Sequence, residues 1–343
     1  MQRRMIAIPA AALALSLGLT ACSGSNGISA DGADSAGGIE GTLDISLLTT
    51  FNGLPFYTAM LCGAQDAAEE IGGDIKITPD GPSRGMNAAD QIPVLEGVAN
   101  RKPDGMIFVP ADPIALEAQA QAAIDSGIAM VTADSSLQNE IALAQFRGDN
   151  KDGGRMAAEE LVRLAGDRSG KVLVLDVRPG LPVTNLRAEG FIEALEEMDT
   201  NLEILETQYH EDDPTKAATI VEGTLEAHPD TFGIFGTSEP ATMGAASALQ
   251  ARGASDDLAV IAFDAGPSLV QALKEGVLDV LIAQGSYQMG YDAVEALVPY
   301  LRDGTEPTSF DNVIDSVVVT KDNVEEPDIA KMLYPESCDS DRN

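Results

Sequence analysis

Short apolar segments alternate with longer segments of helical spacing along the chain from Thr42 onward. The apolar segments are rich in Ile, Val and Phe, and such nearly continuous runs are typical of parallel strands that helices cover on both faces. The pattern predicts strands over residues 42–49, 74–79, 105–110, 129–134, 171–177, 202–208, 231–237, 258–264, 278–285 and 316–320. It predicts helices over residues 55–71, 86–100, 113–126, 154–166, 185–198, 215–228, 241–253, 267–276 and 287–302.

The number of predicted strands indicates two domains. One sheet of average size holds fewer strands than this series contains, and 343 residues are enough for two domains. We therefore expect an α/β fold in which the series divides into two open parallel sheets. No low-complexity linker separates the two halves, which indicates domains that lie close together and move about a hinge.

Polar side chains recur where the predicted strands end. In open α/β sheets, ligands bind beyond the carboxyl ends of the strands. Any one of these residues taken alone could instead cap the helix that follows it, because Asp, Ser and Asn are common N-caps. Their recurrence at nearly every strand end favours a binding site. The candidate positions are residues 50–57, 134–135, 149–150, 182–187, 211–212, 238–239, 263–264 and 284.

The first residues have the pattern of an export signal. Arg3 and Arg4 precede an apolar run that is too short for a comfortable membrane span, and small residues precede Cys22. The segment "LTAC" resembles the lipobox of bacterial lipoproteins, in which the cysteine is lipidated; the alternative is a plain signal peptide with an incidental cysteine. We expect a signal peptide over residues 1–21, a lipid on Cys22, and a flexible Gly/Ser/Asp-rich tether over residues 22–41. The protein would then be exported and anchored to the outer face of the cell membrane.

Charge and motifs argue against nucleic-acid binding and against catalysis. The formal net charge of −34 repels phosphate backbones, and the acidity otherwise indicates a solubility surface. The sequence contains no GxSxG, HExxH or GxxxxGK[ST] motif. It has only two histidines: His228 reads as structural, and His210 lies at a strand end from which it could reach a ligand site. A metal at "HEDD" (residues 210–213) is less expected than a solvated loop.

Several segments together resemble the periplasmic sugar-binding proteins of the ribose-binding type, which are the substrate-capturing subunits of ABC importers. The resemblance runs in order from about residue 42 to residue 320. It is carried by "TTFNGLPFYTAMLCGAQDAAEEIG", "MVTADS", "GDNKDGGRMAAEEL", "NLRAEGF", "FGTSEPATMGAASALQARG", "VIAFDAG" and "IAQGSYQMGYDAVEAL".

The resemblance implies a type I periplasmic binding protein fold, in which two Rossmann-like domains joined by three crossings close over one small ligand. The crossings would lie near Gly148, Gln284 and Asp315. One domain would combine residues 42–147 and 285–314, and the other residues 148–284 and 315–330, followed by a tail over residues 331–343. The implied function is capture of a sugar or polyol by a monomer without a cofactor or enzymatic activity, and its delivery to an ABC permease.

The resemblance also implies a set of ligand residues. Phe56 and Tyr57 would stack on the ligand, and Asn52, or Gly53 in a loop that is one residue longer, would take the position of the family's Asn. Carboxylates accept two hydroxyls at once, and Arg and Gln supply several donors. The remaining positions are Asp134, Arg187, Ser238, Phe263, Asp264 and Gln284.

Two departures from the family pattern suggest a ligand other than ribose. Ser135 follows Asp134 where the family has Arg, and Asp212 stands approximately where it has an aromatic residue. Sugar-responsive repressors share the fold, but they carry an N-terminal DNA-binding motif, and "LTAC" and a tether occupy that place here. A ligand sensor that signals to a chemoreceptor or kinase remains an alternative to transport.

The other two cysteines form a candidate disulfide. Lipidation would use Cys22, which leaves Cys62 and Cys338 in an oxidising setting. Cys62 alone reads as a small buried hydrophobic residue, whereas Cys338 lies in a polar segment with little to bury it. We expect a bridge between them; the alternative is two unpaired cysteines.

Overall fold

The structure is a computed structural model that describes residues 38–83, 87–253 and 258–338. The predicted signal peptide, Cys22 and most of the predicted tether lie outside the described residues. None of the helices in the described ranges is both long enough and apolar enough to cross a membrane.

The first sheet is entirely parallel and has the strand order β12-β5-β4-β3-β1-β2. Its strands are β1 (Leu43–Leu48), β2 (Ile75–Asp80), β3 (Gly105–Phe108), β4 (Ala129–Ala133), β5 (Gln145–Gly148) and β12 (Asp311–Ile314). The helices of this domain are α1 (Pro55–Ile71), α2 (Ala88–Arg101), α3 (Glu117–Asp125) and α9 (Ser286–Asp303).

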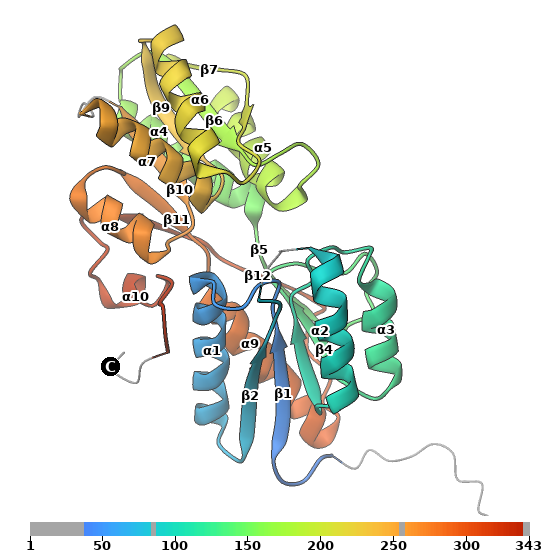
Figure 1. The fold of residues 1–343 in the computed structure, drawn as a ribbon. Helices are drawn as coiled ribbons and strands as arrows, with labels where there is room; N and C mark the ends of the chain where they lie inside the picture. The colour runs from blue at the N-terminus through green and yellow to red at the C-terminus, as the bar shows by residue number, and fades with distance from the viewer. Residues whose placement is uncertain (1–37, 84–86, 254–257, 339–343) are drawn as a thin grey trace, which may run out of the picture. The chain divides into compact units, whose positions relative to one another are not determined.

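Alternation along the strands explains why helices cover both faces of this sheet. Successive side chains of a strand point to opposite faces. Ile45 and Leu47 pack with α1 and α9, whereas Leu48 packs with α2 and α3. Figure 1 shows these two helix pairs on the two sides of the sheet. Because both faces are buried, the central strands β3 and β4 are apolar at nearly every position, which is the pattern that predicted them.

The second sheet has the order β13-β11-β10-β9-β6-β7, and β8 also pairs with β6. All of its pairings are parallel except that of β13 with β11. Its strands are β6 (Gly170–Asp176), β7 (Leu202–Ile204), β8 (Gln208–Tyr209), β9 (Thr231–Gly236), β10 (Ala259–Phe263), β11 (Val280–Ala283) and β13 (Val317–Thr320). The helices are α4 (Asn150–Ala165), α5 (Pro182–Glu197), α6 (Pro214–Ala227), α7 (Glu239–Arg252), α8 (Pro267–Glu275) and α10 (Pro327–Ala330).

The predicted class of two parallel-sheet α/β domains is confirmed. The chain leaves the first sheet after β5, returns after β11 and leaves again after β12. In the second domain, α4 and α5 pack on one face of the sheet, while α7 and α8 pack on the other. The carboxyl ends of the parallel strands of each sheet therefore lie along one edge, where a ligand site is expected.

Some elements differ from those that the sequence predicts. Strands β5 and β12 were not predicted because each has only four residues and carries polar side chains; β12 is the edge strand, and β5 lies next to it. Arg147 of β5 pairs with Asp311 of β12 at 2.7 Å. Helix α3 starts later than predicted because the Asp112 carboxylate accepts hydrogen bonds from the backbone N–H groups of Ile114 and Ala115, which holds this segment in a turn.

Glycines allow two pairs of helices to pack backbone against backbone. In the α1–α9 pair, a β-carbon at Gly63 would collide with the backbone carbonyl of Tyr287, and one at Gly290 would collide with that of Met60. Gly154 and Gly190 play the same part between α4 and α5. The first turn of α1, which carries Phe56 and Tyr57, is therefore fixed closely to α9.

Candidate functional site

Two carboxylates lie at corresponding places in the two domains. Asp134 directly follows β4, and Asp264 directly follows β10. Both have positive φ, 62° and 80° respectively, a conformation that Asp tolerates better than most residues. Their backbone N–H groups still donate to neighbouring strands, to Phe146 and Ile282. The left-handed turn thus places each carboxylate just beyond the end of a sheet.

Arg187 is a buried cation on α5 whose side chain is held on several sides. Its Nε donates to Asn150 Oδ1 at 2.8 Å, and its Nη1 donates to the carbonyl of Thr237 at 3.0 Å. The guanidinium lies 3.8 Å from the centre of the Phe263 ring, which is completely buried. Only 4% of Arg187 is exposed. These contacts fix the guanidinium before any ligand arrives, which reduces the entropic cost of binding.

The Asp264 carboxylate is oriented by donors on one oxygen. Its Oδ1 accepts from Gln284 Nε2 at 2.7 Å and from the Tyr334 hydroxyl at 3.2 Å. Its Oδ2 lies 3.7 Å from Arg187 Nη1, which is an ion pair but too long for a good hydrogen bond. Oδ2 therefore keeps the capacity to accept a hydrogen bond from a ligand hydroxyl.

Tyr57 and Asp134 form the corresponding group of the first domain. The Tyr57 hydroxyl lies 2.8 Å from Thr50 Oγ1 and donates to Asp134 Oδ2 at 3.4 Å. Burial, followed by the charge of Asp134, raises the pKa of the Tyr57 hydroxyl well above its usual value. Tyr57 therefore remains a neutral donor at physiological pH. The Phe56 ring meets the Tyr57 ring edge-on at 5.2 Å.

The Asp134 carboxyl is buried and lies in the electrostatic field of Arg187 and Asp264 from the second domain. Burial raises the pKa of this carboxyl to about 6, the positive charge of Arg187 lowers it, and the negative charge of Asp264 raises it further. The structure thus brings together a set of predicted ligand residues from both domains. We call this set the central group; its members are Tyr57, Asp134, Arg187, Phe263, Asp264 and Gln284.

Other predicted ligand residues have different partners. Asn52 is exposed, and its backbone N–H donates to the Pro82 carbonyl. The Ser135 hydroxyl donates to the Pro110 carbonyl at 2.6 Å, so this contact stabilises its own domain. Asp212 is exposed, with a φ of 63°, and Ser238 Oγ lies 3.4 Å from His210 Nε2. Among the described residues, no hydrogen bond or ion pair joins these four to the central group.

His210 directly follows β8 and lies within the second domain. The residue is completely buried, burial lowers its pKa, and its Nε2 lies 3.4 Å from Ser238 Oγ. The described ranges contain no group of three or more His, Cys, Asp or Glu side chains that could hold a metal ion, and this includes residues 210–213.

Thr237 and Tyr334 help to hold the site together and were not predicted as site residues, whereas Asn150 was already a candidate strand-end position. Asn150 and Thr237 contact Arg187, and Tyr334 contacts Asp264. Residues 331–343 were predicted to be a tail with little to bury, but Tyr334 is only 4% exposed and its ring meets Phe56 edge-on at 5.3 Å. The apolar "MLY" in an otherwise polar segment was the available signal for Tyr334.

Cys62 and Cys338 are joined by a disulfide in the structure, with their Cα atoms 5.2 Å apart. This distance lies within the range of ordinary disulfides. Cys62 is buried in α1, so the bond attaches the end of the described chain to the helix that carries Phe56 and Tyr57.

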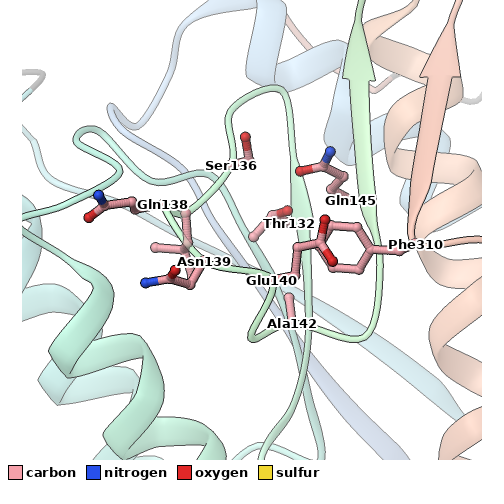
Figure 2. A pocket seen from close by; sticks show the side chains of 9 residues that line it. Thr132, Ser136, Gln138, Asn139, Glu140, Ala142, Gln145 and Phe310 are labelled. Carbon is pink, nitrogen blue, oxygen red and sulfur yellow. The ribbon is translucent and has the colours of Figure 1, made fainter.

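A separate small pocket lies on the first domain, beside the connection from β4 to β5. Its volume is about 200 Å³, and it contains none of the predicted ligand residues. Figure 2 shows Ser136, Glu140, Gln145 and Phe310 around it. Gln145 donates to Asp311 at 2.7 Å. None of the residues of the central group lines this pocket.

Comparison with known proteins identifies the family. The model of the periplasmic binding protein domain matches residues 45–306. The chain therefore belongs to the periplasmic binding protein family. Within it, the predicted likeness to sugar-binding proteins of the ribose-binding type is confirmed. The ribose import binding protein of Bacillus subtilis is 28% identical over 278 residues, which are 81% of this chain and 87% of that protein.

Solved structures agree with this assignment. A solute-binding protein of an ABC transporter from Agrobacterium vitis, crystallised with α-D-tagatopyranose, is 32% identical with a TM-score of 0.76, and the match covers 86% of this chain and 100% of that one. A second solute-binding protein from the same organism, with bound D-fucose, is 30% identical with a TM-score of 0.73, and covers 84% and 99% of the two chains. Both have the type I periplasmic binding protein fold.

Proposed function

We propose that this protein captures a small sugar or polyol outside the cytoplasm by closing its two domains around it, and delivers the ligand to an ABC importer. The central group supports capture. Asp134 and Asp264 accept hydrogen bonds from hydroxyls, Arg187 donates to ring or hydroxyl oxygens, and the aromatic rings pack on C–H faces. Binding rather than catalysis fits this set, since it offers acceptors and donors but no activated nucleophile.

The observation that carries the proposal is the arrangement of Asp264. One of its oxygens is occupied by Gln284 and Tyr334, and the other lies near a fixed guanidinium. A carboxylate held in this way can accept a hydrogen bond from a ligand hydroxyl without reorganisation. Delivery to an importer is inferred from the relatives, which are described as a ribose import binding protein and as ABC transporter solute-binding proteins.

A thermal-shift screen followed by calorimetry tests capture. The full chain is heated with D-ribose, D-tagatose, D-fucose and a polyol such as D-mannitol. A ligand that binds only the folded protein, at a hundred times its Kd, adds about 2.7 kcal/mol to the free energy of unfolding and raises the melting temperature. The absence of a shift and of binding heat with all sugars and polyols at millimolar concentration would contradict the proposal.

The affinity for the sugar is expected to decrease when the pH is lowered below about 6. A hydroxyl donates to the ionised form of Asp134, whose pKa burial raises to about 6 in the unliganded protein. Protonation thus competes with the sugar, and we expect affinity at pH 5 to be about tenfold lower than at pH 7.5. Asp134→Asn should bind more weakly at pH 7.5 and lose most of this pH dependence. Calorimetry at both pH values checks the prediction; an unchanged affinity in the unsubstituted protein contradicts it.

The stability of the unliganded protein should change with pH in the opposite direction. Because the pKa of Asp134 is higher in the folded than in the unfolded chain, the folded protein binds more protons between about pH 4 and 6. The contribution of this carboxyl to the free energy of unfolding therefore falls as the pH rises through that window. Asp134→Asn removes this contribution and serves as the control.

We also propose that Cys22 carries the lipid that anchors the protein, because "LTAC" precedes a Gly/Ser/Asp-rich segment. Replacing Cys22 by alanine should prevent lipidation and move the protein from the membrane fraction to the soluble fraction. Fractionation followed by immunoblotting measures this, with the unsubstituted protein as the reference. If the Cys22→Ala protein remains in the membrane fraction after processing, the anchor is wrongly assigned.

A further inference from the structure

The last described segment, residues 331–338, which we call the C-terminal strap, contacts the candidate ligand site. The Tyr334 backbone N–H donates to the Ala265 carbonyl at 3.1 Å. Its hydroxyl accepts from the backbone N–H of Gln284 at 3.0 Å and donates to Asp264 Oδ1 at 3.2 Å. One buried side chain thus fixes both the crossing at Gln284 and the carboxylate of Asp264.

The chemistry of the Tyr334 hydroxyl fits this bridging position. A phenol can accept one hydrogen bond and donate another, which is what Gln284 and Asp264 require. Burial, followed by the negative charge of Asp264, raises the pKa of Tyr334 well above its usual value. The hydroxyl therefore keeps the proton that it donates.

The strap packs against the core through apolar side chains, and a disulfide bonds its last residue to α1. Met332 and Leu333 pack against the core of the second domain, and Tyr334 lies within that core together with Ala59 of α1. Four residues after Tyr334, Cys338 is bonded to Cys62 of α1. The strap is thus fixed at one end to Asp264 and Ala265, and at the other to the helix that carries Phe56 and Tyr57.

We infer that Tyr334 is a positioning residue for the ligand-binding groups Asp264 and Gln284, and that the Cys62–Cys338 disulfide holds it in place, so that reducing this bond weakens ligand binding. This inference rests on the proposed function. Reduction by a dithiol breaks the S–S bond, and each sulfur gains one electron and one proton while the dithiol becomes a cyclic disulfide. The strap is then held only by its noncovalent contacts.

The first test needs no ligand. Hydrogen exchange of the Gln284 backbone amide is measured in the full chain, in Tyr334→Phe, in Cys338→Ser and after reduction by dithiothreitol. Tyr334→Phe keeps the ring and the disulfide but removes the acceptor of this amide, so its exchange should become about tenfold faster. Tyr291→Phe is the matched control, because the Tyr291 hydroxyl donates to the Glu70 carboxylate at 2.6 Å on the surface, within the first domain.

The second test measures affinity for D-ribose, D-tagatose and D-fucose by calorimetry. We expect Tyr334→Phe to weaken binding about tenfold, Cys338→Ser and the reduced protein to weaken it about three- to tenfold, and Tyr291→Phe to leave it unchanged. Unfolding curves are recorded for each variant, because a merely structural role would lower the melting temperature without lowering affinity.

The outcomes separate this inference from the proposed function. Unchanged Gln284 exchange in Tyr334→Phe and after reduction overturns the positioning role, whatever sugar binds. Faster exchange with unchanged affinity for a sugar that does bind overturns the link to ligand binding. Faster exchange with no binding of any sugar overturns the proposed function, and the claim on affinity with it.

Discussion

Replacing Arg187 by alanine is expected to weaken sugar binding by about 2–5 kcal/mol, because the ligand oxygens would lose a buried charged donor and the Asp264 carboxylate would lose its ion-pair partner. The guanidinium is 4% exposed, and it is fixed by Asn150, Thr237 and the Phe263 ring. Calorimetry with the sugar found in the thermal-shift screen measures the loss.

The matched control for this variant is Arg163→Ala. Arg163 lies on α4, its side chain is 58% exposed, and its Nε donates to Glu160 at 2.7 Å. The Arg163→Ala protein should bind the sugar with the affinity of the unsubstituted protein. Because Arg187→Ala also removes buried contacts, its folding is checked by urea unfolding. Asp264→Asn is a second variant: Asn tolerates the φ of 80° and keeps the side-chain shape, but it lacks the charge. Unchanged affinity in both site variants would show that the central group does not bind the ligand.

Removing the Cys62–Cys338 bond is expected to lower the free energy of unfolding by up to about 4–5 kcal/mol, because the bond closes a very long loop in the unfolded chain. The two cysteines are 276 residues apart in sequence. Urea unfolding of Cys62→Ser/Cys338→Ser measures the loss, and Cys22→Ser, which keeps the bond, should show no loss.

Intact-mass analysis checks that the bond exists in the protein. The mature protein is unfolded without reductant and alkylated, and then again after reduction. We expect no label on Cys62 and Cys338 before reduction and one on each afterwards. Two labelled thiols before reduction would contradict the disulfide.

Most of the fold could be predicted because the apolar pattern of a buried strand lies within that strand's own sequence. Strands such as β6 and β10, buried on both faces, must be apolar at nearly every position, so they are visible in the sequence. Edge strand β12 and its neighbour β5 mix polar with apolar residues, and their pairing joins residues as far apart as Gln145 and Asp311. No local pattern encodes such a pairing.

The candidate site could be predicted only in part from the sequence. Asp134 and Asp264 directly follow strands, so the rule of strand ends selected them; it also selected Arg187 and Gln284, which the family resemblance implied as well. The same rule also selected Asn52, Ser135, Asp212 and Ser238, because it cannot distinguish a side chain that points to a ligand from one that bonds to its own loop. Tyr334 was missed since it is 70 residues from Asp264, in a segment without periodicity.

The first domain is discontinuous in sequence, and this has a consequence for the order of folding. Residues 43–148 provide five of its strands, but α9, which packs along α1, and the edge strand β12 come only at residues 286–314. The central part of the chain, in contrast, provides α4 to α8 and β6 to β11 without interruption. A nascent chain can thus assemble most of the second domain before the first domain has all its parts. We expect the amino-terminal half to expose the apolar face of α1 until α9 has been synthesised, and to depend on chaperones for that interval.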